Sequence, residues 1–68
     1  MTKREIRQKA AALLGERAEL RRHGHVFVIG LNLGSLGFQA WGEGGSWEAA
    51  LEAAASAKRA ADMEWVDA

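Results

Sequence analysis

The chain has no cysteine and no long uninterrupted apolar segment, and each absence excludes a class of protein. Without cysteine it has no disulfide framework, no thiolate metal site and no cysteine nucleophile. Its longest run without a charged residue, 26–42, is broken by glycine and polar residues, whereas a transmembrane helix needs roughly 20 predominantly apolar residues. Mixed charge in residues 1–5 predicts that there is no signal peptide. We therefore expect an intracellular, cytoplasmic protein that does not enter a membrane.

Catalytic and cofactor-binding motifs are also missing. The sequence contains no Gly-x-Ser-x-Gly motif, no phosphate loop and no paired carboxylates. The segment His23-Gly24-His25 offers two imidazoles, but a metal site needs three or four ligands and the chain has no other histidine. We predict a non-enzymatic protein with no metal and no cofactor.

The 68 residues form a single small domain, residues 1–68, whose core is limited. Apolar residues make up 49% of the chain, but fourteen of them are alanines, which bury little surface. A chain of about 60 residues buries only about 60% of the surface that its unfolded form exposes. Small domains without disulfides or metals commonly gain stability from a partner, so we expect self-association or a bound protein.

Charge is distributed unevenly although the net charge is zero. Residues 1–34 hold seven of the nine Lys and Arg and three of the nine Asp and Glu, for a net charge of +4. Residues 35–68 hold the remainder, for a net charge of −4. The two halves can attract each other within one chain or between two chains.

A first helix is predicted from Lys3 to about Arg22. Thr2 and Glu5 have the spacing of a capping box, and apolar residues then recur at helical spacing as far as Leu20. Cations in the last predicted turn suit the negative end of the helix dipole, and Gly24 is suited to end the helix.

A β-hairpin is predicted next. The alternation from His25 to Leu33 is typical of a strand, Gly34-Ser35 fits a two-residue type II′ turn, and Leu36 to Trp41 would return antiparallel. This register pairs Leu31 with Phe38, Ile29 with Ala40 and Val28 with Trp41. The face to be covered by the helices consists of Phe27, Ile29, Leu31 and Phe38.

A second helix is predicted from Trp47 to about Met63, after a flexible connection at 42–45 and an N-cap at Ser46. Residues 64–66 could be a last helical turn or a short added strand. Alanines dominate the inward stripe, which lets the helix approach its neighbour closely.

The predicted fold is α+β with the order α-β-β-α: two helices pack on one face of an antiparallel hairpin. Because a two-stranded sheet is marginal, we expect a second copy to extend it as a homodimer.

An exposed aromatic patch is predicted on the opposite face of the hairpin. Exposed aromatic and β-branched residues are typical of protein interfaces. The predicted partner-binding residues are Val26, Val28, Gln39 and Trp41. In the alternative, Trp41 folds back under residues 42–45.

The basic first helix is the second candidate surface. Its possible charged contacts are Arg4, Arg7, Arg17, Arg21 and Arg22. They could follow a nucleic-acid backbone, but three glutamates interrupt the run and the isoelectric point of about 6.7 is below that of typical nucleic-acid binders. A solvated face or a pairing with the acidic half accounts equally well for them.

The strand at 37–41, the glycine-rich turn at 42–45 and the helix capped by Ser46 resemble a segment of HicB-type antitoxins. The resemblance covers residues 37–51, and the long first helix and the longer turn depart from that pattern. Our favoured hypothesis is a small protein-binding accessory protein of a phage or mobile element, either an inhibitor of a host defence complex, such as an anti-CRISPR, or an antitoxin. The alternative is a dimeric nucleic-acid-binding protein that uses the basic helix.

Overall fold

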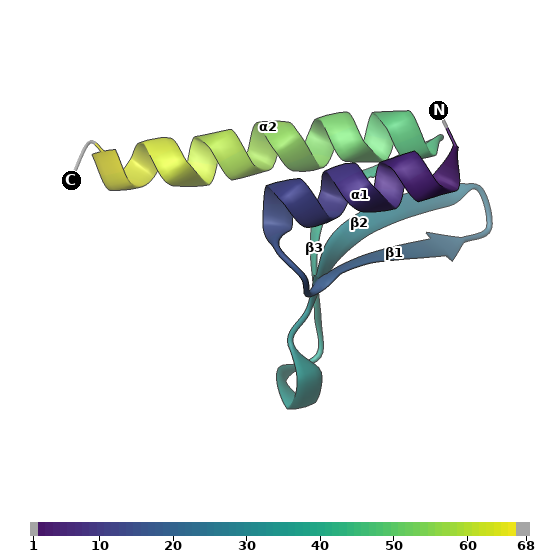
Figure 1. Ribbon diagram of the computed structural model, residues 1–68, viewed down its shortest axis with the longest axis horizontal. Helices are drawn as coiled ribbons and strands as arrows, with labels where there is room; N and C mark the ends of the chain where they lie inside the picture. The colour runs from purple at the N-terminus through teal and green to yellow at the C-terminus, as the bar shows by residue number, and fades with distance from the viewer. Residues whose placement is uncertain (1, 67–68) are drawn as a thin grey trace.

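The structure, a computed structural model, describes the backbone of residues 2–66 and the side chains of residues 2–63. It consists of two helices and a three-stranded antiparallel sheet with strand order β1-β2-β3 (Figure 1). In chain order the elements are α1 (Lys3–Leu14), β1 (Ala18–His23), β2 (Val26–Asn32), the short 3₁₀ helix η1 (Gly34–Leu36), β3 (Phe38–Gly44) and α2 (Trp47–Val66). The α+β class is confirmed.

Both helices pack on the same face of the sheet, as predicted (Figure 1). α2 lies mainly on β3, and α1 lies beside α2 and over β1. The sheet has one strand more than predicted, because the second half of the predicted first helix is a strand. α2 continues to Val66, so residues 64–66 are a last helical turn. Trp65, which the sequence pattern places on the inward stripe, lies outside the described side chains.

The prediction that the first helix runs to Arg22 is wrong, because α1 ends at Leu14 and Gly15 is its C-cap. Thr2 caps its start, where the Glu5 amide donates to Thr2 Oγ1 at 3.2 Å. Gly15 has φ of 97° and donates its amide to the Ala11 carbonyl. That left-handed φ is accessible to glycine at little cost, and it turns the chain out of the helix. In β1 the residues that follow alternate between the helix-covered face, with Leu20, and the outer face, with Glu19 and Arg21.

The predicted hairpin register is also wrong. A 3₁₀ turn replaces the two-residue turn, so Asn32 pairs with Phe38 and Leu31 with Gln39. The register then shifts at Ile29/Gly30, where β3 carries one extra residue, and Ile29 pairs with Gly42 instead of Ala40. A bulge of this kind places two successive side chains on one side of a strand. Leu31–Phe38 and Val28–Trp41 are therefore not partners, and Phe38 lies on the outer face.

Small residues let α2 pack closely on the sheet. The fully buried residues are Ile6, Ala10, Ile29, Ala50 and Ala54. A Cβ atom at Gly42 would lie 2.2 Å from the Ala54 nitrogen and 2.4 Å from the Ala50 carbonyl oxygen, so the backbones of β3 and α2 touch there. Residues 42–44 accordingly belong to β3, not to a flexible connection. Ser46 caps α2 as predicted, with Oγ accepting from the Ala49 amide at 3.1 Å.

Candidate functional site

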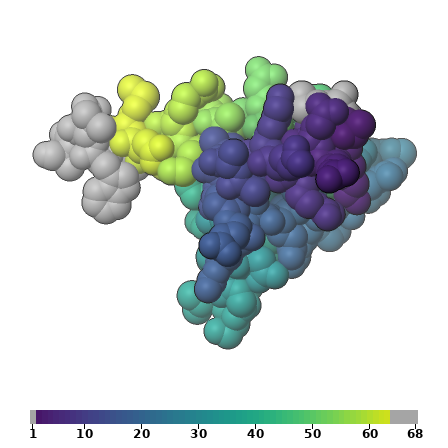
Figure 2. Space-filling view, in the orientation of Figure 1, coloured from purple at the N-terminus to yellow at the C-terminus, as the bar shows by residue number. Residues whose placement is uncertain are grey.

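The most prominent feature outside the core is the hairpin end at residues 31–39, which we call the tongue. It projects away from both helices (Figures 1 and 2). Its turn is closed by backbone hydrogen bonds: the Leu33 amide donates to the Gly37 carbonyl at 2.7 Å, and the Gly37 amide donates to the Gly34 carbonyl at 3.0 Å. The tongue is therefore an ordered hairpin end with its own hydrogen bonds.

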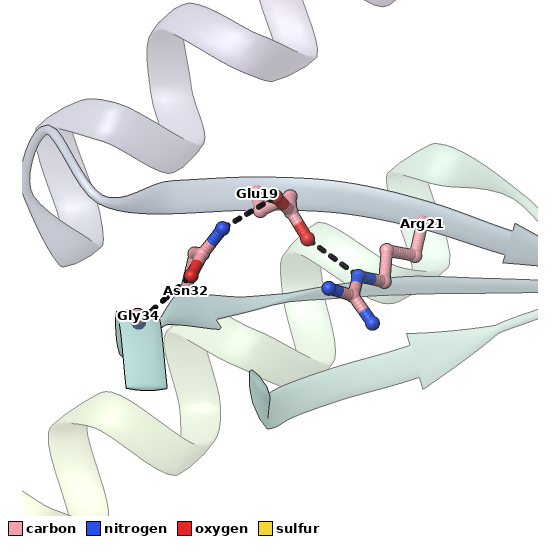
Figure 3. Close-up of polar contacts among 4 residues, drawn as sticks. All are labelled: Glu19, Arg21, Asn32 and Gly34. Carbon is pink, nitrogen blue, oxygen red and sulfur yellow. Dashed lines mark hydrogen bonds and ion pairs between the residues drawn. The ribbon is translucent and has the colours of Figure 1, made fainter. Parts of the chain in front are cut away.

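Asn32 fastens the base of the tongue to β1 (Figure 3). Its Nδ2 donates to Glu19 Oε1 at 3.1 Å, and its Oδ1 accepts from the Gly34 amide at 2.9 Å. The second carboxylate oxygen of Glu19 accepts from Arg21 Nε. Hydrogen bonds from Arg21 and then from Asn32 lower the pKa of Glu19 below its ordinary 4.5, because both stabilise the ionised form. This network fixes the direction in which the tongue leaves the sheet.

The tongue exposes apolar side chains beside the polar residues Asn32, Ser35 and Gln39. Leu36, at its tip, is 85% exposed, and Leu31, Leu33 and Phe38 are half-buried. None of these four side chains belongs to the core cluster or to the apolar residues packed against it. No charged residue occurs between positions 26 and 42. The tongue thus has no charged residue of its own and carries an exposed leucine at its tip, on a domain in which 26% of residues are charged.

The four residues predicted to bind a partner do not form one surface. Val26 and Val28 lie on the outer face of the sheet, where Val28 is only 7% exposed. Gln39 pairs with Leu31 in the tongue. Trp41 is half-buried and packs against the core on the helix-covered side, because the bulge turns it inward. Its Nε1 is buried without a hydrogen-bond partner among the described residues. The predicted aromatic patch is therefore not assembled.

The five arginines predicted to lie on the first helix are divided among α1, the turn that follows it and β1. Arg4 and Arg7 lie on the exposed face of α1, where with Lys3 they border a shallow hollow of about 600 Å³. The hollow is also lined by Gln8 and Ala11. No described side chain forms an ion pair with any of these three cations. Lys3 in addition lies over the Trp47 ring.

The other three arginines follow α1. Arg17 lies in the turn before β1, whereas Arg21 and Arg22 lie in β1 and, as neighbours in a strand, point to opposite faces. The Arg21 guanidinium lies 4.1 Å from the ring centroid of Phe38 on the outer face. The Arg22 guanidinium lies 5.1 Å from the ring centroid of Phe27. Arg21 and Arg22 therefore contact aromatic side chains of the sheet and do not extend the basic face of α1.

An aromatic pair, Phe27 of β2 and Trp47 of α2, lies near the start of α1. The rings of Phe27 and Trp47 pack edge to face with centroids 4.8 Å apart. Lys3 lies 5.7 Å from the Trp47 ring centroid, and Arg22 contacts the Phe27 ring. Both rings are half-buried, so they serve packing more than stacking with a ligand.

The described residues contain no group of three or more His, Cys, Asp or Glu side chains that could hold a metal ion. His23 and His25 flank the turn between β1 and β2 and are exposed. Within residues 2–66, neither helix has the length and apolar character needed to span a bilayer.

Sequence reasoning missed the tongue. The signal was present in the charge-free run 26–42, but the alternation of that run predicted a hairpin with one face covered by the helices along its whole length. Only the register and the length of β2 show that its far end passes beyond the core. No protein-family model, curated protein or solved structure matches this chain.

Proposed function

We propose that this chain is a non-enzymatic protein that binds another protein through its tongue. The supporting observation is the apolar surface that the tongue presents outside the core, with Leu36 at its tip 85% exposed. Burying one leucine side chain in a partner contributes about 2 kcal/mol, which corresponds to about 30-fold in affinity. An ordered projection loses little conformational entropy on binding, so most of this contribution is retained.

The chemistry of the tongue favours a protein partner over nucleic acid. Binding to nucleic acid depends on cations that neutralise phosphates, and residues 26–42 contain none. Apolar side chains on a projection are instead suited to an apolar pocket on a protein surface. The partner we propose therefore offers an apolar pocket of leucine size.

Nucleic-acid binding through α1 is the second candidate function. One observation favours it, namely that Lys3, Arg4 and Arg7 form no ion pair with a described side chain. Contacts from these three cations to phosphates would give a slope of about −2.7 when the logarithm of the binding constant is plotted against the logarithm of salt concentration. Absence of binding to duplex or single-stranded nucleic acid at low salt would exclude it.

The setting we propose is that of a cytoplasmic accessory protein of a phage or mobile element, acting as an inhibitor of a host defence complex, such as an anti-CRISPR, or as an antitoxin. The small size and the lack of a catalytic motif support this setting. A homodimer is a separate proposal, and the third strand weakens its original argument, which depended on a sheet of only two strands. Sedimentation at two concentrations tests it, because a constant mass of 7.4 kDa would be that of a monomer.

Site-specific photocrosslinking tests the proposed function. A photoreactive leucine analogue at position 36 is compared in host extract with the same analogue at Ala60, an exposed position on α2. We expect a protein adduct from position 36 that resists nuclease treatment and is absent from position 60. Equal adducts from both positions, or an adduct to nucleic acid alone, would refute a protein contact at the tongue.

A further inference from the structure

The tongue extends beyond the parts of the molecule that could hold it by packing. β1 pairs with β2 only as far as Ala18, opposite Leu31, and the last backbone bond on that side runs from the Asn32 amide to the Arg17 carbonyl. Past that point the tongue consists of two strands and a turn, and its apolar side chains lie outside the core cluster. A two-stranded hairpin is at best marginally stable in water. The orientation of the tongue therefore depends on contacts at its base.

Arg21 of β1 is linked to both strands of the tongue. Its Nε donates to Glu19, whose other carboxylate oxygen accepts from Asn32 Nδ2 at 3.1 Å (Figure 3). Asn32 Oδ1 in turn accepts from the Gly34 amide in the turn. The Arg21 guanidinium also lies 4.1 Å from the ring centroid of Phe38. Asn32 of β2 and Phe38 of β3 are partners in the sheet, so Arg21 reaches the two strands at the same level.

Gly30 lets the Phe38 ring lie close to the sheet. A Cβ atom at Gly30 would lie 2.8 Å from Phe38 Cζ and 2.1 Å from the Gln39 carbonyl oxygen, so no side chain fits between the ring and β2. The ring therefore contacts the β2 backbone as well as the Arg21 guanidinium. Phe38 is half-buried in this way although it lies outside the core cluster.

We propose that Arg21 is a positioning residue that holds the tongue in one orientation for its protein partner. The inference deepens the proposed function and rests on it, because the partner is reached through the tongue. Arg21 acts through Phe38 on β3 and through Glu19 and Asn32 on β2. Because both strands are held, binding does not have to order the tongue. A projection of this kind suits a partner whose apolar pocket is already formed, since neither side then loses conformational freedom.

Arg22 provides a matched control on the other face of β1. Its guanidinium also lies near an aromatic ring, 5.1 Å from the Phe27 centroid. Its other described contact is with the Gly24 carbonyl, which accepts from its Nε at 2.9 Å. Arg21→Met and Arg22→Met therefore remove the same group from adjacent positions of one strand, and only the first removes a contact to the tongue.

Native-state hydrogen exchange followed by NMR tests the proposal on the intact chain. The reporters in the tongue are the amides of Leu33 and Gly37, which both donate to carbonyls within the turn, and the buried Ala54 amide in α2 reports global opening. We expect Arg21→Met to speed exchange of the two tongue amides about tenfold relative to Ala54, as loss of a hydrogen bond to a charged group predicts. Arg22→Met should leave that ratio unchanged. An unchanged ratio in Arg21→Met, or an equal rise in Arg22→Met, would overturn the proposal.

Variants of Phe38 separate the contact with Arg21 from a general loss of packing. Phe38→Tyr keeps the ring and Phe38→Leu removes it, so we expect only the leucine variant to speed exchange in the tongue. Because Arg21 acts partly through the ring, Arg21→Met combined with Phe38→Leu should speed exchange by less than the product of the two single effects. Equal exchange in the tyrosine and leucine variants, or a double variant equal to that product, would overturn the link through Phe38.

One measurement needs no variant and decides if Arg21→Met does not fold. In the unmodified chain the backbone order parameters of Leu33 and Gly37 should be about 0.85, the value of a rigid backbone. Values below about 0.6 at both positions would show a flexible tongue and overturn the proposal.

The crosslinking assay separates this inference from the proposed function. With the photoreactive leucine analogue at position 36, Arg21→Met should lower the yield of the protein adduct and Arg22→Met should not. An unchanged yield in an Arg21→Met chain whose tongue exchanges faster would overturn positioning for the partner and leave the proposed function standing. Absence of any protein adduct from the unmodified chain, together with the expected exchange, would refute the proposed function and leave the hold of Arg21 on the tongue standing.

Discussion

Replacement of Gly42 by alanine is the most direct test of how the two layers pack. The added Cβ atom would lie 2.2 Å from the Ala54 nitrogen, 2.4 Å from the Ala50 oxygen and 2.7 Å from the Ala54 Cα. All three are backbone atoms of α2, so no side chain can rotate away to make room. Ordinary contact begins at 3.4 Å, and relief therefore requires β3 and α2 to separate by about 1 Å.

The separation has a predictable cost. Overpacking substitutions destabilise by about 1–3 kcal/mol, and a clash with rigid backbone belongs at the upper end of that range. The displaced helix also carries Ala50 and Ala54, which together with Ile29 form much of the buried core. We expect a loss of about 3 kcal/mol in the free energy of unfolding, against a total of roughly 3–10 kcal/mol for a domain of this length. The melting temperature should fall by about 12–24 °C.

Urea unfolding followed by tryptophan fluorescence and circular dichroism measures this effect. The matched control is Gly45→Ala, because a Cβ atom at Gly45 would meet no atom within 4 Å. We expect the control to stay within about 0.5 kcal/mol of the unmodified chain. A Gly42→Ala variant as stable as the control would show that β3 and α2 do not touch as described.

Three further measurements test separate parts of the structure. Ser46→Ala should destabilise by about 1 kcal/mol in urea, because the Ala49 amide loses its capping acceptor; an unchanged midpoint would contradict the cap. The pKa of the Glu19 carboxyl should lie below 4.5 by NMR, and this pKa should rise towards 4.5 in Arg21→Met. Because the pKa is lowered in the folded state, the ionised carboxylate stabilises the fold above its unfolded pKa. This contribution is lost as pH falls through the folded pKa. A midpoint at or above 4.5 in the unmodified chain would contradict the network. Ile29→Val should cost about 1 kcal/mol by thermal unfolding, as expected where a buried methyl group is removed, and a neutral result would place Ile29 outside the core.

Local signals predicted the starts of both helices but not the end of the first. Thr2 and Ser46 cap α1 and α2 because their hydroxyls accept nearby amides, an interaction that needs no tertiary contact. The end of α1 was misplaced because Leu20 fits both a helical stripe and the alternation of a six-residue strand. Gly15 decides between these two structures, and a single glycine inside a periodic segment is a weak signal.

The register of β3 depends on tertiary packing and was not accessible from alternation. A regular ladder would put Trp41 opposite Val28, and the pattern of side chains is consistent with it. The structure inserts a bulge instead, because Gly42 must lie opposite Ile29 for α2 to pack against the sheet. The candidate site was missed for the same reason, since the aromatic patch predicted around Trp41 depended on the regular register.

The order of the elements also bears on how the chain folds as it is made. Each strand pairs with its neighbour in sequence, so the sheet can form by successive hairpins without closing long loops. α1 differs, because it packs against α2, which begins at Trp47. During synthesis, which proceeds from the N-terminus, the buried face of α1, with Ile6 and Ala10, can pack on β1 first, but it is fully covered only when α2 has left the ribosome. α1 precedes the sheet in the chain, yet its packing is completed after that of the sheet.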